Sequence, residues 1–185
     1  MTDAYSFRRL VRADLRRYHE VFGTGVPTGV RFWLALFGPR FVPVLLYRIA
    51  FKLTTLRLTP LARIVSIINF MMFGIEIAIR CPIGPGFIIP HSQGTVIGAA
   101  AIGANATIFQ GVTLGARELD AQFEFDRRPT LGDDVSIGSG AKVLGGIMIG
   151  DGAKVGANTV VLESLPPGAV AVGASARVIL PGEGR

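Results

Sequence analysis

Cysteine and histidine are scarce in this sequence. Its 185 residues include one cysteine, Cys81, and two histidines, His19 and His91. A single cysteine excludes an internal disulfide framework and any zinc site built from several cysteines, and it is compatible with a reducing compartment. Two histidines are too few for a zinc centre that needs three of them. We therefore expect no metal ion.

Long charge-free hydrophobic runs are also missing from the first part of the chain. The longest one, residues 64–75, has twelve residues, whereas a membrane-spanning helix needs about 18 or more. Closely spaced arginines before residue 18 interrupt any signal-peptide pattern. Half of the residues are hydrophobic and 17% are charged, which excludes a disordered chain. These features predict a folded, cytoplasmic protein.

Acidic residues are rare in the first third of the chain. Residues 1–63 contain eleven Arg and Lys against three Asp and Glu, a net charge of +8, whereas residues 64–185 contain eight against ten, a net charge of −2. A basic N-terminal part is compatible with phosphate-bearing partners, anionic lipid or a polyanionic glycan. No nucleic-acid-binding motif accompanies the charge, and no nucleic-acid partner is expected.

Residues 1–75 have the pattern of an α-helical region. Apolar residues recur at spacings of three and four, which predicts an amphipathic helix with arginines on its other face. This stripe consists of Phe7, Val11, Leu15, Tyr18 and Phe22. His19 is expected on the solvated face. The apolar segments that follow are expected to pack on each other and on neighbouring chains; the alternative is peripheral membrane contact through residues 30–57, where arginines alternate with large apolar residues.

From about residue 77 the chain follows a period of six. One set of aliphatic residues at this step is Leu131, Ile137, Val143, Ile149, Val155 and Val161. The same step occurs at Ile77, Ile83 and Ile89, and again at Val96, Ile102, Ile108 and Leu114. Three residues after each member of the first set stand the turn residues Asp134, Gly140, Gly146, Gly152, Asn158 and Ser164. Most of these tolerate a left-handed backbone.

This period predicts a parallel β-helix of hexapeptide repeats, in which short strands stack around an aliphatic core. Neither an amphipathic helix nor a two-layer sandwich produces it. The step breaks once between Ile89 and Val96, and again between Leu114 and Leu131, where a charged loop at residues 116–130 is expected to project from the coil. The fold class is therefore mainly β, with an α-helical region at 1–75 and a β-helix domain at 76–185.

Five segments of the coil resemble the serine acetyltransferase branch of the left-handed β-helix acyltransferases. They are IIPHSQG, TIFQGVTLG, the loop ending DRRP, IGSGAKVLGGIMIGDGAKVGANTVV and PPGAVAVGASARVI. The resemblance covers residues 76–179. The N-terminal segments VLLYRIA and MMFGIEI look more similar to the colanic acid and exopolysaccharide acetyltransferases of that branch. The resemblance implies a homotrimer, or a dimer of trimers, with acetyl-CoA in grooves between neighbouring coils.

The resemblance assigns His91 as the general base. An alcohol is a poor nucleophile near neutral pH, and imidazole has a suitable pKa for removing its proton as the oxygen attacks a thioester. The family pairs this histidine with an acidic residue fifteen positions earlier, which is Glu76 here. Glu76 would hold the imidazole in one tautomer and stabilise the imidazolium.

The resemblance also implies residues for the acceptor and the cofactor. Arg127 resembles a carboxylate-binding arginine, and Gln110 and Arg128 complete the acceptor-binding set. The cofactor set consists of Ser139, Lys154, Ala157 and Arg177, whose two cations would meet the CoA phosphates. Serine acetyltransferases have an acid where this chain has Pro90, and a histidine where it has Arg128.

These two departures lead us to expect a sugar acceptor. A free amino acid needs a group that neutralises its ammonium, and Pro90 cannot supply one. The expected function is therefore acetyl-CoA-dependent O-acetylation of a sugar in a surface or extracellular polysaccharide. The alternatives are serine O-acetylation in cysteine biosynthesis and, in another class, a non-catalytic β-helix scaffold.

Overall fold

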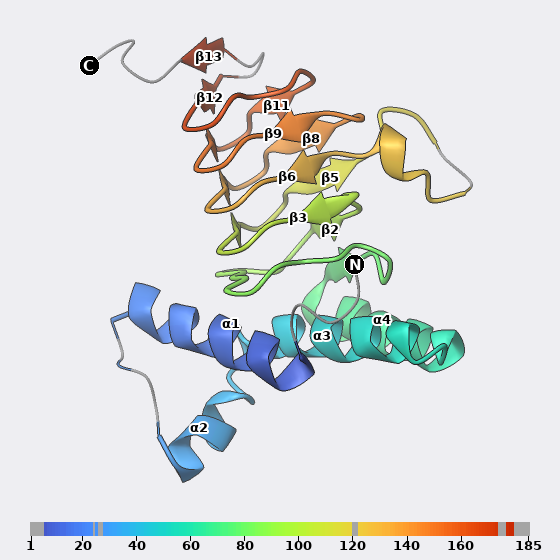
Figure 1. Ribbon diagram of the computed structural model, residues 1–185, viewed down its shortest axis with the longest axis vertical. Coiled ribbons are helices and arrows are strands. Elements are labelled where there is room, and N and C mark those ends of the chain that lie inside the picture. The colour runs from blue at the N-terminus through green and yellow to red at the C-terminus, as the bar shows by residue number, and fades with distance from the viewer. Residues whose placement is uncertain (1–5, 24, 26–27, 120–121, 174–176, 180–185) are drawn as a thin grey trace.

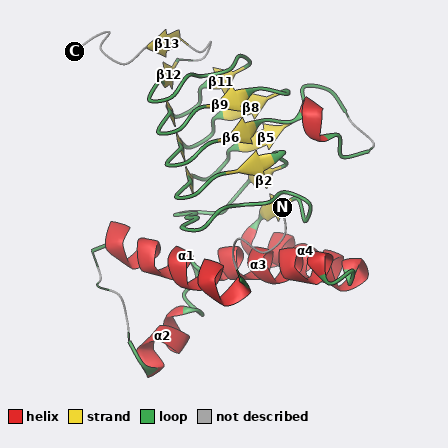
Figure 2. Cartoon of the chain, viewed as in Figure 1, coloured by secondary structure: helices red, strands yellow, loops and turns green. Residues whose placement is uncertain are grey.

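The computed structural model describes residues 6–23, 25, 28–119, 122–173 and 177–179, and it consists of a helical layer beneath an upright coil of short strands (Figure 1). The helices are α1 (Phe7–Val21), α2 (Val30–Ala35), α3 (Val42–Thr55) and α4 (Thr59–Phe73). They all lie at one end of the coil (Figure 2). The longest described helices, α1 and α4, have 15 residues each, and among the described residues no helix is long and apolar enough to cross a membrane.

The coil has three sheets. The first contains β1 (Ile75–Ile77), β2 (Thr95–Ile97), β5 (Thr113–Gly115), β8 (Lys142–Leu144) and β11 (Val160–Val161). The second contains β4 (Thr107–Ile108), β7 (Ser136–Ile137), β10 (Lys154–Val155), β12 (Val170–Val172) and β13 (Arg177–Ile179), and the third contains β3 (Ala101–Ile102), β6 (Thr130–Leu131) and β9 (Met148–Ile149). All described strand pairs are parallel except β12 with β13.

Strand pairing confirms the hexapeptide repeat. Lys142 pairs with Val160, 18 residues further on, so that one turn of the coil takes three units of six. Thr113 pairs with Lys142, 29 residues further on, because the extra residues form the projecting loop at 116–130. This loop leaves the coil between the first and third sheets, as the sequence predicts (Figure 1). We call this corner the loop corner.

The aliphatic positions predicted from the period are buried, with one exception. Leu131, Ile137, Val143, Ile149, Val155 and Val161 are all at most 3% exposed. Val96, however, is 37% exposed, and its neighbour Ile97 points into the core at 1%. The prediction for Val96 is wrong because side chains alternate along a strand, and β2 turns Thr95 and Ile97 inward.

Left-handed backbone marks the corners of the coil. Asp134, Gly140, Gly152 and Asn158 have positive φ angles, as their place in the repeat predicts. Gly146 does not, because the turn after β8 uses Gly145 instead, at φ 100°. Ser164 is likewise absent from the positive-φ residues of the described chain. The predicted turn residues therefore have a left-handed backbone, except Gly146 at the loop corner and Ser164 near the end of the coil.

The helical layer packs on the first two turns of the coil. Arg17 donates hydrogen bonds to the carbonyls of Gly86 (2.6 Å) and Ala106 (3.0 Å) and to the hydroxyl of Thr107. Tyr47 donates one to the carbonyl of Cys81 (2.6 Å). The predicted apolar stripe of α1 packs within the helical layer, where Val11 and Leu15 form a cluster with Leu36 and Phe41. His19 differs from its prediction: it is half-buried, with its ring 5.4 Å from that of Tyr18.

Candidate active site

One corner of the coil collects several of the predicted site residues. It lies between the second and first sheets, and its stacked turn residues are Gly94, Gly111, Gly140 and Asn158. Backbone hydrogen bonds link successive turns: Gly111 N–H to the Gln93 carbonyl, Gly140 N–H to the Gln110 carbonyl, and Asn158 N–H to the Ser139 carbonyl. We call this the histidine corner, because His91 lies at its lower end.

His91 is exposed in a turn that is longer than those above it. Five residues lie between Ile88 and Gly94, whereas three lie between their counterparts Thr107 and Gly111. The two extra residues allow the turn to bulge from the coil. The turn is held in place next to the coil, because the hydroxyl of Ser92 donates a hydrogen bond to the Phe73 carbonyl at the end of α4. A solvent-accessible imidazole on a fixed turn is suited to proton transfer.

Glu76 lies on the outer face of the first sheet, directly opposite Val96 in the pairing of β1 with β2. It is exposed and lines a groove of about 970 Å³ beneath the loop, together with Arg63, Phe70 and Phe123. Within the described residues, no hydrogen bond or ion pair joins Glu76 to His91. The pairing of these two side chains therefore stays a prediction.

The predicted cofactor residues lie higher on the same side of the coil. Ser139 and Ala157 immediately precede the corner residues Gly140 and Asn158. Lys154 is exposed on β10 of the second sheet, next to this corner. Arg177 lies in β13 with its Cα opposite that of Val172, and its side chain falls outside the described part of the chain. The structure thus brings three of the four cofactor residues to one edge.

Gln110 is half-buried at the histidine corner, one turn of the coil above His91. Its side-chain Oε1 is buried and has no hydrogen-bond partner among the described residues. Sequence reasoning gave no role to Lys142, whose Nζ donates a 2.5 Å hydrogen bond to the carbonyl of Gly111 at this corner. Its outward position in the repeat resembled that of a surface lysine, so no sequence signal distinguished it.

Arg128 is bound to the coil. Its Nη1 donates a 2.8 Å hydrogen bond to the Gly98 carbonyl, and its guanidinium carbon lies 3.9 Å from the ring centroid of Phe123. Arg117 bonds the carbonyls of Leu144 and Leu162 at the other end of the loop. Arg127 instead forms ion pairs with two carboxylates of the loop itself. The prediction of acceptor binding by Arg128 assumed a side chain free to turn toward the acceptor.

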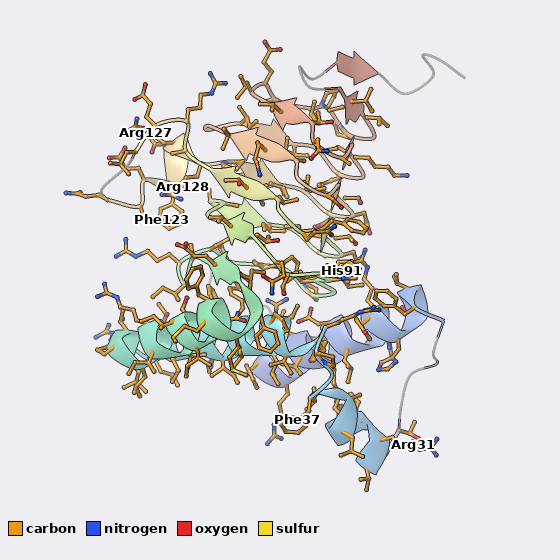
Figure 3. All side chains as sticks on the ribbon, turned by 180° about the vertical axis from the view of Figure 1, so that it is seen from behind. Arg31, Phe37, His91, Phe123, Arg127 and Arg128 are labelled. Atoms are coloured by element: carbon orange, nitrogen blue, oxygen red, sulfur yellow. The ribbon has the colours of Figure 1, made fainter. Side chains whose placement is uncertain are left out.

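The predicted base His91 and the predicted acceptor-binding residues Arg127 and Arg128 lie on different sides of one chain. Figure 3 shows His91 on the far side of the coil from the labelled loop residues Phe123, Arg127 and Arg128. The reason is topological, since the histidine corner precedes each strand of the first sheet and the loop corner follows it.

A coil of six-residue units, with an accessible histidine and small residues along one corner, defines the class of hexapeptide-repeat acyltransferases. Residues 128–163 match the family model described as bacterial transferase hexapeptide (six repeats). Serine acetyltransferase of Helicobacter pylori strain 26695 is 40% identical over 178 residues, which cover 95% of each chain.

Solved structures agree with this match. Soybean serine acetyltransferase superposes with a TM-score of 0.83 at 36% identity, over 94% of this chain and 69% of its own. A serine acetyltransferase in complex with CoA gives 0.80 at 31% identity, over 94% of this chain and 70% of its own. The chain belongs to the serine acetyltransferase family, and it is an acyltransferase that uses acetyl-CoA as co-substrate.

These findings overturn the expected function. The relatives are named serine acetyltransferases, and the identity extends along nearly the whole chain, helical region included. O-Acetylation of a polysaccharide sugar was the wrong prediction, and so was the closer likeness to colanic acid acetyltransferases. The first prediction placed too much weight on Pro90 and Arg128, and the second on the short N-terminal segments VLLYRIA and MMFGIEI. Membrane contact through residues 30–57 finds no support in these relatives either.

Proposed function

We propose that this protein is a serine O-acetyltransferase, which transfers the acetyl group of acetyl-CoA to the hydroxyl of serine in cysteine biosynthesis. The observation that carries the proposal is the 40% identity with a serine acetyltransferase along 95% of both chains. An accessible histidine on a fixed turn provides the general base that this reaction needs.

In the proposed reaction, the imidazole of His91 takes the proton of the serine hydroxyl as its oxygen attacks the thioester carbon. The carbon–sulfur bond then breaks, and the CoA thiolate takes a proton from the imidazolium, which restores the neutral base. No covalent acyl-enzyme forms, so no cysteine or serine nucleophile is required. Glu76 would stabilise the imidazolium if its side chain turns toward the corner.

We further propose a left-handed coil and a homotrimer with the active site between chains. Two observations support the trimer. In one chain, His91 and the loop occupy different corners, so that a loop from a neighbouring chain can meet His91 (Figure 3). In addition, the outer face of α4 exposes Leu61, Ile64, Ile68, Met71 and Met72, an apolar patch typical of an interaction surface.

Acetyl-CoA would lie along the histidine corner. Ser139 and Ala157 have small side chains that leave the backbone open to a pantetheine arm, and Lys154 presents an exposed ammonium beside them for a CoA phosphate. Arg177 would supply a second cation. The described residues contain no group of three His, Cys, Asp or Glu side chains able to hold a metal ion.

The contacts of Arg128 remove one objection to serine. Arg128 stands where the family has a histidine, and a guanidinium turned toward the acceptor would repel the ammonium of serine. Because Arg128 is bound to the Gly98 carbonyl and stacked on Phe123, its position is fixed by the coil rather than by the acceptor. Pro90 is buried, which leaves the counter-charge for the ammonium to be found elsewhere in the chain.

The test is acetyl transfer itself. Purified protein is incubated with acetyl-CoA and either serine, threonine or a panel of oligosaccharides, while thiol release and acetylated product are measured. We expect O-acetylserine, with a kcat/KM for serine on the order of 10⁴ M⁻¹s⁻¹ or above. Thiol release that depends on an oligosaccharide and not on serine would contradict the proposal.

A further inference from the structure

The projecting loop contains three arginines, and they have two kinds of partner. Arg117 and Arg128 donate to backbone carbonyls of the coil and so anchor the two ends of the loop. Arg127 binds carboxylates instead: its Nη2 lies 3.2 Å from Glu118 Oε2 and its Nη1 lies 3.6 Å from Glu124 Oε2. The Arg127 side chain is 41% exposed, so a ligand can reach it.

Arg127 is the residue that the family resemblance matches to a carboxylate-binding arginine. We propose that Glu124, its ion-pair partner on the loop, binds the ammonium of serine and so completes the recognition site for the amino acid. This inference rests on the proposed function, because it takes serine as the acceptor. The carboxylate of serine replaces Glu118 on the guanidinium, and Glu118 returns to solvent.

The charges favour this exchange. A guanidinium that already holds two carboxylates on separate nitrogens has the geometry to bind a third in place of one of them. A zwitterion inserted between Arg127 and Glu124 gives each of its charges an opposite charge. A neutral sugar forms no ion pair in such a site. A ligand with an ammonium but no carboxylate is repelled by the guanidinium of Arg127. The pair therefore selects for both charged groups of an α-amino acid.

Burial and backbone geometry assign different roles to the two glutamates. The Glu118 side chain is 81% exposed, whereas that of Glu124 is 47% exposed. Glu124 immediately precedes the short 3₁₀ helix Phe125–Arg127, and its carbonyl accepts a hydrogen bond from the Arg127 N–H. Its position relative to Arg127 is thus set by one turn of backbone. Glu118 lacks this tie and is the easier of the two to displace.

This site also accounts for the missing acid before His91. Pro90 is buried and carries no charge, so the segment before the base cannot neutralise an ammonium. The loop supplies the negative charge instead, and in the proposed trimer it does so from the chain that faces His91. Base and acceptor-binding groups then come from two subunits.

The experiment compares serine with 3-hydroxypropionate, which keeps the hydroxyl and the carboxylate but has no ammonium. KM for each acceptor is measured by thiol release in the full-length protein and in Glu124→Gln, Glu118→Gln and Asp126→Asn. Asp126 is the matched control, because it is an exposed acid of the same loop whose side chain forms no ion pair with Arg127 or with any other described residue.

We expect Glu124→Gln to raise KM for serine about three- to fivefold, which corresponds to loss of one partly exposed ion pair. KM for 3-hydroxypropionate should stay within about twofold, so that the preference for serine falls by the same factor. Glu118→Gln should lower KM for both acceptors about two- to fivefold, since it removes the competitor for Arg127. Asp126→Asn should leave both values unchanged, and melting temperatures should match throughout.

The outcomes separate this inference from the proposed function. If the unmodified protein does not acetylate serine, the proposed function fails and this site fails with it. If serine is acetylated but Glu124→Gln keeps the full preference for serine over 3-hydroxypropionate, only the site is wrong. A loss of preference in Glu118→Gln alone would also overturn the assignment.

Discussion

Arg48 of α3 and Asp14 of α1 form a buried ion pair within the helical layer, at its contact with the coil. Arg48 Nε lies 2.8 Å from Asp14 Oδ2, and the two side chains are 1% and 0% exposed. Both groups also bind the first turn of the coil: Arg48 donates to the carbonyls of Ile83 and Gly84, and Asp14 accepts the N–H of Phe87. The pair therefore couples α1 and α3 to the segment that leads to His91.

The first prediction concerns this pair. Arg48→Met should lower the free energy of unfolding by about 3–5 kcal/mol, because it leaves a buried carboxylate without its counter-charge. Burial already raises the pKa of Asp14, and Arg48 opposes that rise. Without Arg48 the pKa rises further. A carboxyl whose pKa is raised on folding makes the fold less stable as the pH rises, so the deficit of the variant should grow as the pH rises above the pKa of Asp14 in the unmodified protein.

Denaturant unfolding at several pH values measures this deficit. The double variant Asp14→Leu with Arg48→Met is the control, since it removes both charges together. It should be less destabilised than the sum of the two single variants. Strict additivity, or a deficit of Arg48→Met that does not change with pH, would show that the pair is not coupled as the structure indicates.

The second prediction concerns the base. His91→Ala should reduce turnover about 10²–10⁴-fold, the usual contribution of a general base, while the melting temperature stays the same because His91 is exposed. His19→Gln, at the other histidine of the chain, should keep its activity. Equal rates for His91→Ala and the unmodified protein would sink the assignment.

The third prediction concerns Cys81. Its side chain is fully buried, and burial raises the pKa of the thiol from 9.0 to about 12. Because the thiolate is the reactive form, the folded protein should react with an aromatic disulfide reagent at pH 8 at least about 10³-fold more slowly than the unfolded chain. The stability of the fold should also decrease above about pH 9, where the unfolded thiol ionises and the buried one does not. Rapid labelling of the native protein would contradict this burial.

The repeat made most of the fold predictable. A period of six places aliphatic residues at the same point of every unit, and Leu131, Ile137 and Val143 are buried accordingly. The register of β2 was not predictable, because Val96 and Ile97 are both aliphatic and the number of residues in the preceding turn decides which one points inward. The hydrophobic pattern alone does not show how many residues a turn contains, and therefore does not set the register of the strand that follows it.

The candidate site was predictable to a smaller extent. Ser139 and Ala157 are 18 residues apart, so the period places them one turn above the other on the same corner. The His91 turn breaks the step, and its role came from the family resemblance. The partners of Arg128 were not predictable, because Gly98 and Phe123 meet only once the loop folds back. A side chain judged by its charge alone was therefore given to the acceptor, and the acceptor was predicted wrongly.

The last prediction concerns the cofactor. Lys154 is exposed on β10 beside the histidine corner, where a CoA phosphate would meet its ammonium. If it binds the 3′-phosphate, Lys154→Ala should weaken CoA binding about tenfold and leave dephospho-CoA binding nearly unchanged, because only CoA carries that group. Arg177→Ala should be measured in the same way, and Lys52→Ala, an exposed lysine of α3, is the control. Calorimetry with both nucleotides distinguishes the cases. Equal losses for CoA and dephospho-CoA would move Lys154 away from the 3′-phosphate, and no loss for either would leave it without a role in cofactor binding.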